Sequence, residues 1–243
     1  MRAHLPDTVT LTGGLSADGN RFRETLVLSG ETIDRGLVAA VGLHSNRLTV
    51  GYASWGGWVP FGPKRLITKS QGNVLYELDG QSALDLYKKY LGDYASGLPA
   101  TGLLFPLHLH NISGDRAVVR TILAVDEIEQ NLTFAGDVPE GSIVQLMQAN
   151  CDRLVDGAIA AAQTSLAAHP SAAPDLAVLI SCVGRKLVLK QRIEEEVEGI
   201  REVMGESTIL TGFYSYGEIA PAELGESCQL HNQTMTITTF SEP

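Results

Sequence analysis

Residues 176–182 read LAVLISC, an almost continuous apolar run. A strand with one face in water alternates apolar and polar residues, whereas a strand covered on both faces reads as an unbroken apolar run. Residues 176–182 therefore predict a strand in the interior of a sheet, with other elements packed against both of its faces.

Two amphipathic helices are predicted beside this strand, at 152–168 and 191–204, because apolar residues recur there at helical spacing. Pro170 ends the first helix, since proline cannot continue the hydrogen-bond ladder. Further strands are predicted at 208–211 and at 229–240, a segment rich in threonine and β-branched residues.

The first 150 residues are predicted to be mostly strands, joined by turns that contain glycine. The predicted strands are 8–12, 25–29, 37–43, 48–53, 66–69, 74–78, 117–125, 132–134 and 142–148. The strands 37–43 and 48–53 are expected to form a hairpin, and 54–63 a loop. One helix is expected at 82–91, capped by Asp79 or Ser82 and ended by Gly92. The predicted class is α+β (mixed α/β), with β meanders, crossover helices and two quasi-equivalent sheet-containing subdomains.

The composition limits the classes of partner. Lys and Arg number 18 against 28 Asp and Glu, a formal net charge of −10, and such a surface repels nucleic acid and anionic membranes. Three cysteines without metal-ligand spacing favour a reducing compartment. The N-terminus has no signal-peptide pattern and no apolar run is long enough to span a bilayer, so a cytoplasmic location is expected.

The densest polar cluster lies near the C-terminus, in GFYSYGE and CQLHNQT. Its candidate ligand-binding residues are Tyr214, Ser215, Tyr216, Glu218, His231, Asn232 and Gln233. An imidazole beside primary amides suits recognition of a carboxylate, amide or amino group. The alternative is that His231 and Asn232 hydrogen-bond loop backbone and hold the fold together.

A second cluster, SCVGRK at 181–186, follows the apolar strand, where ligands often bind. Arg185 is a candidate for pairing with an anion or, alternatively, an exposed residue of a tight turn. Cys182 is either a ligand-site residue or a small core side chain. No nucleophile signature surrounds it, so we expect no enzymatic turnover that depends on Cys182 or His231.

Three further patterns have a functional and a structural interpretation. His108 and His110 share one side of a strand, where they suit either a metal or a surface role. The glutamates 194–196 are interpreted as a solvated helix face. The segment LTGGLSADG at 11–19 resembles LTGFYSYGE at 210–218, which indicates either two half-sites of one cleft or a chance likeness of two glycine-rich turns.

Four stretches together resemble the FIST family (F-box and intracellular signal transduction proteins). They are GNVLYELDGQSALDLYKKYLG at 72–92, FAGDVPEGSIVQLM at 134–147, SCVGRKLVL at 181–189, and GFYSYGEIAP with LHNQTMTITTF within 212–240. The resemblance implies a partial FIST N-terminal domain at 1–54, only its second half, and a FIST C-terminal domain at 55–243.

The resemblance also implies a non-catalytic sensory module of a prokaryotic signalling system, with a small-molecule ligand such as an amino acid. Family members are linked to histidine kinases, cyclic-dinucleotide enzymes and chemotaxis receptors, so a separate signalling partner is expected. No metal or resident cofactor is expected. The alternative is a haem-binding nitric-oxide sensor, which would need a histidine such as His231 or His108 in an apolar pocket.

Two structural expectations follow. The side chains of Tyr214, Ser215, Tyr216, Glu218, His231 and Gln233 are expected to line one polar cleft. A homodimer is expected through the N-terminal strands of residues 8–53, in preference to helix 191–204, because the first half of the N-terminal domain is missing and leaves a sheet edge unpaired. The competing expectation is a monomer in which Trp55 and Trp58 cover that edge.

Overall fold

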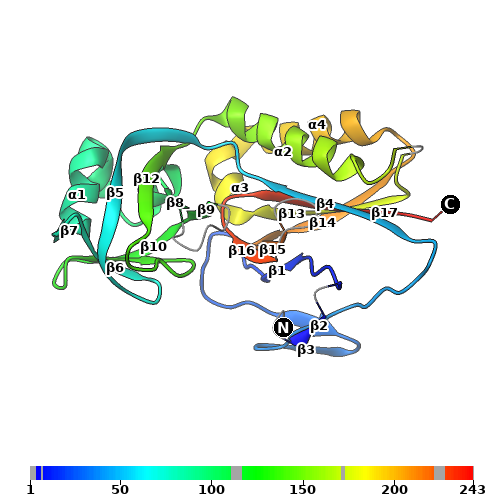
Figure 1. Ribbon diagram of the computed structural model, residues 1–243, viewed down its shortest axis with the longest axis horizontal. Helices are drawn as coiled ribbons and strands as arrows, with labels where there is room; N and C mark the ends of the chain where they lie inside the picture. The colour runs from blue at the N-terminus through cyan, green and yellow to red at the C-terminus, as the bar shows by residue number, and fades with distance from the viewer. Residues whose placement is uncertain (1–3, 7, 111–116, 171–172, 222–227, 243) are drawn as a thin grey trace. The chain divides into compact units, whose positions relative to one another are not determined.

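A computed structural model describes the whole chain except residues 1–3, 7, 111–116, 171–172, 222–227 and 243, and it divides into two compact units (Figure 1). Unit 1 comprises Met1–Gly56, Val155–Leu230 and Thr234–Pro243, and unit 2 comprises Gly57–Leu154 and His231–Gln233. Each unit contains both sheet and helix, which confirms the predicted α+β class.

Unit 1 is built on a four-stranded sheet in the order β14-β13-β17-β4. The strands are β14 (Ile209–Ser215), β13 (Leu176–Cys182), β17 (Met235–Ser241) and β4 (Thr49–Trp55). Strand β13 pairs in parallel with β14 and antiparallel with β17. The interior strand predicted at 176–182 is therefore confirmed.

Helices α2 (Cys151–Leu166) and α4 (Glu194–Met204) supply the apolar layer on one face of this sheet (Figure 1). Small side chains let the elements approach closely, since Ala158, Ala161 and Ala162 of α2 are fully buried in this core. A Cβ added to Gly51 of β4 would lie 2.0 Å from the carbonyl oxygen of Ser165, so only glycine fits there.

The crossover from β13 to β14 differs from the prediction. A helix α3 (Val183–Leu189) and a short 3-10 turn η4 (Lys190–Arg192) precede α4, which begins at Glu194 rather than at residue 191. Five of the seven α3 residues are buried, including Val183 and Val188. Its apolar residues lack the wide periodic stripe of a surface helix, because this helix is enclosed.

Two predictions for the N-terminal segment are wrong. Residues 8–12 form no strand, and 37–43 does not pair with 48–53 as a hairpin, because β4 pairs instead with β17. Val38, Val41 and Leu43 are 73%, 87% and 61% exposed, so no neighbouring strand buries these apolar side chains. The segment forms only β1 (Gly13–Gly14) and a small hairpin of β2 (Val27–Ser29) and β3 (Thr32–Asp34).

The predicted strand at 229–240 is split into β16 (Gln229–His231) and β17. Gln233 lies at the break with φ of 62°, a left-handed conformation that no regular strand residue adopts. Strand β16 joins β15 (Glu218–Ala220) and β1 in a separate three-stranded sheet. The backbone thus changes sheets at residues 232–234.

Unit 2 is an antiparallel sheet in the order β10-β11-β6-β5-β12-β8-β9, with β7 paired to β6. Its strands are β5 (Val59–Gln71), β6 (Val74–Leu78), β7 (Gln81–Ser82), β8 (Leu107–His110), β9 (Val118–Arg120), β10 (Ile122–Asp126), β11 (Asn131–Phe134) and β12 (Ile143–Gln148). The predicted loop at 54–63 is mostly strand, since β4 ends at Trp55 and β5 begins at Val59. The 13-residue length of β5 allows it to pair with both β6 and β12.

Helix α1 (Ala83–Leu91) packs on this sheet and confirms the predicted helix. The Ser82 hydroxyl accepts a hydrogen bond from the Asp85 N–H at 3.1 Å, and Gly92 follows the last helical residue. Two short 3-10 helices, η2 (Gly92–Gly97) and η3 (Ala100–Leu104), follow α1.

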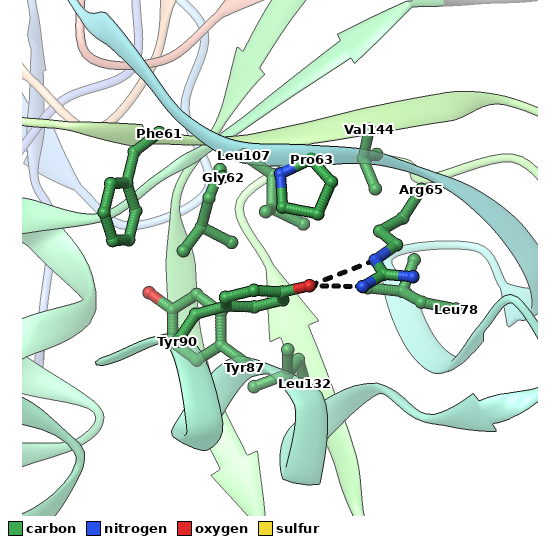
Figure 2. Close-up of a pocket in the computed structure, with 11 residues that line it drawn as sticks. Phe61, Gly62, Pro63, Arg65, Leu78, Tyr87, Tyr90, Leu107, Leu132 and Val144 are labelled. Atoms are coloured by element: carbon green, nitrogen blue, oxygen red, sulfur yellow. Dashed lines mark hydrogen bonds between the residues drawn. The ribbon is translucent and has the colours of Figure 1, made fainter. Parts of the chain in front are cut away.

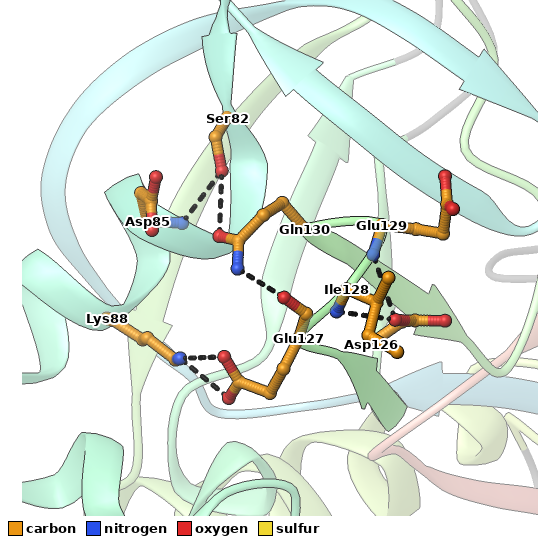
Figure 3. A network of polar contacts seen from close by, with 8 residues as sticks. All are labelled: Ser82, Asp85, Lys88, Asp126, Glu127, Ile128, Glu129 and Gln130. Carbon is orange, nitrogen blue, oxygen red and sulfur yellow. Dashed lines mark hydrogen bonds and ion pairs between the residues drawn. The ribbon is translucent and has the colours of Figure 1, made fainter.

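Helix α1 is also tied to the β10–β11 turn (Figure 3). The Lys88 ammonium contacts both carboxylate oxygens of Glu127, at 2.6 and 2.5 Å. The Asp126 carboxylate accepts hydrogen bonds from the backbone of Ile128 and Glu129, which fixes the turn. Within the described residues, no helix has the length and apolarity needed to cross a membrane.

Candidate ligand-binding site

The candidate site lies in unit 1, where β13 and β14 both end. These strands run in parallel, so Ser181 lies beside Tyr214 and Cys182 beside Ser215. The chain continues from β13 into α3 and from β14 into β15. Loops at the carboxyl ends of parallel strands converge, which makes this edge a favoured ligand position.

A fully buried ion pair lies beside this edge. Arg185 of α3 and Glu196 of α4 both have side chains that are 0% exposed. The Arg185 Nε and Nη2 atoms donate to Glu196 Oε1 at 2.7 and 2.5 Å, and Nη1 donates to the carbonyl oxygen of Gly56. The Ser181 hydroxyl is 3.5 Å from Glu196 Oε2. The guanidinium is therefore committed to partners of its own chain.

Glu218 of β15 is a second fully buried carboxyl. It accepts hydrogen bonds from the Ser215 hydroxyl and, at 2.9 and 3.2 Å, from the hydroxyl and N–H of Thr234. Burial raises the pKa of Glu218 to about 7, while the bonds from Ser215 and Thr234 and the charge of Arg185 act in the opposite direction.

Tyr214 is half-buried. The Lys186 ammonium lies 4.6 Å from the centre of its ring. Burial and then the Glu196 carboxylate raise the pKa of Tyr214 to about 12, so its hydroxyl keeps its proton at neutral pH. Among the described residues this hydroxyl has no hydrogen-bond partner, and it is therefore a donor available for another molecule.

The two similar segments of the sequence lie against each other. Gly14 of β1 pairs with Glu218, and the Tyr216 N–H donates to the carbonyl oxygen of Leu15. The Tyr216 hydroxyl bonds the Asp18 carboxylate, and the Phe22 ring stacks on the Tyr216 ring with centroids 4.8 Å apart. That hydroxyl, followed by backbone N–H groups, holds the pKa of Asp18 well below its usual range. Hydrogen bonds and ring stacking thus hold residues 13–22 against the residues that follow β14.

The sequence interpretation of two charged residues needs correction. Arg185 is not an exposed residue of a turn, and Glu196 does not belong to a solvated face, since both are fully buried. The spacing of Glu196, Ile200 and Met204 places them on one side of α4, and all three are buried. Val197, an apolar residue of the same helix, is instead 44% exposed. Asp18 lies in the segment 11–19 that the sequence suggested as a half-site, but its pairing with Tyr216, 198 residues away, was not predicted.

His231, Asn232 and Gln233 are buried and belong to unit 2. The Asn232 amide donates to the carbonyl oxygen of His231 at 3.0 Å, and the Gln233 amide is 3.3 Å from the carbonyl oxygen of Leu103. The Trp58 indole donates to the carbonyl oxygen of Gln233. A single cleft that includes His231 and Gln233 stays a prediction.

The other candidate residues have these positions. Cys182 is buried, and its N–H donates to the carbonyl oxygen of Thr234 at 3.1 Å. The rings of His108 and His110 lie 4.5 Å apart on β8, and burial lowers the pKa of His108 to about 4, aided by the charges of His110 and Lys64. The described residues hold no group of three or more His, Cys, Asp or Glu side chains suited to a metal.

Unit 2 contains a small apolar pocket that the sequence analysis did not find (Figure 2). Phe61, Pro63, Tyr87, Leu107, Leu132 and Val144 are among the lining residues. Arg65 Nε is 3.2 Å from the Tyr90 hydroxyl, and Arg65 Nη1 contacts Asp79 at 3.0 Å. The volume, about 10 Å³, is room for about one water molecule. The lining residues come from six separate elements, so no local pattern in the sequence predicts the pocket.

Comparison with known proteins matches the sequence to two family models. The FIST N domain model matches residues 1–81, and the FIST C domain model matches residues 83–221. The chain belongs to the FIST family, whose domains are associated with sensing in signal transduction. The domain boundary expected after residue 54 stays a prediction.

One curated relative is an uncharacterized protein of Methanocaldococcus jannaschii, 26% identical over 208 residues. The aligned region covers 79% of this chain and 38% of the relative, so the chain spans well under half of that protein's length. No solved structure matches the chain.

Proposed function

We propose that this chain is a non-catalytic sensory domain that binds a small carboxylate, such as an amino acid, at the carboxyl ends of β13 and β14. The observation that carries the proposal is the Tyr214 hydroxyl, a protonated donor without a partner among the described residues, on a ring whose centre lies 4.6 Å from the Lys186 ammonium. A neutral donor next to a cation is suited to a carboxylate.

The buried charges around Tyr214 support this choice of site. Burying Arg185 and Glu196 contributes little to stability compared with apolar residues of the same volume, because both charges lose their hydration. After the larger effect of burial, the Glu196 carboxylate raises the pKa of Tyr214, so this buried charge helps to keep the Tyr214 hydroxyl protonated.

The absence of catalysis is part of the proposal. Cys182 is 5% exposed, which leaves its thiol little access to a substrate. The third member of a catalytic triad accepts a hydrogen bond from the histidine ring, whereas Asn232 Oδ1 accepts none among the described residues and its amide N–H donates to the carbonyl oxygen of His231. We further propose a prokaryotic, cytoplasmic setting and a separate signalling partner such as a histidine kinase, in line with the family's association with signalling.

A thermal-shift screen against the twenty amino acids and short carboxylic acids tests the proposal. A ligand at 100 times its Kd adds ~2.7 kcal/mol to the free energy of unfolding, which raises the melting temperature measurably. Each compound that shifts the wild-type chain is then titrated by calorimetry into Tyr214→Phe. We expect binding to weaken about tenfold or more, because a hydrogen bond to a charged group is lost.

Tyr76→Phe is the matched control. Tyr76 is also a half-buried tyrosine with a lysine over its ring, Lys69 at 5.5 Å, but it lies in unit 2. Binding should be unchanged in this variant. Equal affinity in Tyr214→Phe and wild type, or no shift with any compound, would contradict the proposal. So would a visible absorption band of bound haem that is lost in His231→Ala.

A further inference from the structure

Strand β14 forms an open edge of the unit 1 sheet. The strand order ends at β14, and no described strand pairs with its outer side. Ile209 is 66% exposed and Phe213 is 47% exposed. The opposite edge is different, because four of the seven residues of β4 are buried. An open edge offers unpaired N–H and C=O groups to any strand that approaches.

The sequence of β14 does not discourage such pairing. Natural proteins protect edge strands with charged side chains or proline, and the seven residues ILTGFYS contain neither. The charge of the chain, −10, should keep two copies apart, yet none of that charge lies on this strand. The paired strands themselves therefore bring no like charges into contact.

The strand is also complementary to itself. Alternation puts Ile209, Thr211 and Phe213 on one face, while Leu210 packs toward the core. In an antiparallel pair of two β14 strands centred on Thr211, Ile209 of each copy lies opposite Phe213 of the other. Aromatic and β-branched residues are a favourable cross-strand pair, and the symmetry provides it twice.

We propose that two copies of this chain dimerise through β14, pairing the strands antiparallel about Thr211 and joining two four-stranded sheets into one. The β2–β3 hairpin is a less suitable interface, because its strands have three residues each and include the charged Asp34. The proposal is independent of the ligand and of the function assigned above.

Light scattering after size-exclusion chromatography tests the interface across micromolar concentrations. The wild-type chain should approach twice the monomer mass of 26.0 kDa as concentration rises. Thr211→Lys should be monomeric, since the symmetry places the two lysines opposite each other. Thr211→Glu should be monomeric for the same reason. An equimolar mixture of the two variants should recover the dimer, because the opposed charges now attract.

The mixture distinguishes a lost interface from a damaged fold, and circular dichroism confirms that each variant is folded. Ile33→Lys on β3 is the matched control, since Ile33 is 63% exposed on the N-terminal hairpin. It should leave the dimer intact. A wild-type chain that stays monomeric, a mixture that stays monomeric, or a dimer broken by Ile33→Lys and not by Thr211→Lys would overturn the proposal.

Discussion

The two units bury different kinds of side chain. Arg185, Glu196 and Glu218, the fully buried charged residues among those described, all lie in unit 1. The core of unit 2 is apolar and consists of residues such as Ile67, Leu75 and Leu132. Apolar burial stabilises a fold without regard to pH, whereas buried charge stabilises it only with its partners present.

This difference suggests that the two units have different roles, one structural and one in binding. Unit 2 contains a continuous hydrophobic core under an antiparallel sheet and a pocket with room for about one water molecule. Unit 1 holds polar groups where two parallel strands end. We therefore expect substitutions in unit 1 to act through charge and pH, and those in unit 2 to act through packed volume.

The largest expected effect is at the buried ion pair. Arg185→Met leaves the Glu196 carboxylate buried without its cation, and such a loss costs ~3–5 kcal/mol. Urea denaturation should show a fall of this size in the free energy of unfolding. The double variant Arg185→Met with Glu196→Leu should recover most of the loss, because no charge is then left unpaired. A double variant no more stable than the single one would show that the loss does not come from the unpaired Glu196 charge.

Glu218 should make the stability of unit 1 depend on pH. Its pKa rises from 4.5 in the unfolded chain to about 7 in the folded one. As pH rises between these values, the unfolded chain ionises first, so stability is full at low pH and is lost toward pH 7. Glu218→Gln has no group that ionises here, so its stability does not fall with pH. Above pH 7 its free energy of unfolding should exceed that of the wild type by roughly 3 kcal/mol at most. Urea denaturation at a series of pH values measures the gain, and a constant difference between the two proteins would disprove it.

Unit 2 supplies the contrasting case at Ile67, which is 1% exposed in its core. Ile67→Val removes one buried methyl group and should cost about 1 kcal/mol, because of the lost transfer energy and the space left behind. Urea denaturation should show the same decrease in the free energy of unfolding at pH 5 and at pH 8. A cost that varies with pH would show that the core of unit 2 is coupled to an ionising group.

The smallest effect is expected at the Lys88–Glu127 pair, whose side chains are 31% and 59% exposed. Glu127→Gln should cost less than about 1 kcal/mol, and the cost should shrink as salt is added, since solvent and ions screen the pair. Denaturation at low and high salt measures both. A cost near that of Arg185→Met would mean that exposure does not separate the two ion pairs.

Local sequence patterns correctly predicted the elements in which buried residues follow a regular spacing along the chain. The run LAVLISC became the interior strand β13, and Ser82 and Gly92 bound helix α1 as expected. The prediction of a strand at 37–43 was wrong. Its valines favour an extended backbone, but no other strand pairs with the segment. Helix α3 was missed, since an enclosed short helix and a buried strand have similar sequences.

The sequence by itself determined the α+β class, the family and the segments that contain most of the candidate site, because these depend on nearby residues and on their order. Only the tertiary structure decided that Arg185 pairs with Glu196 and that Asp18 meets Tyr216. It also decided that residues 13–14 join β15 rather than a strand of their own segment. The reason is physical: a charge becomes buried, and an edge strand stays open, through contacts between segments far apart in the chain.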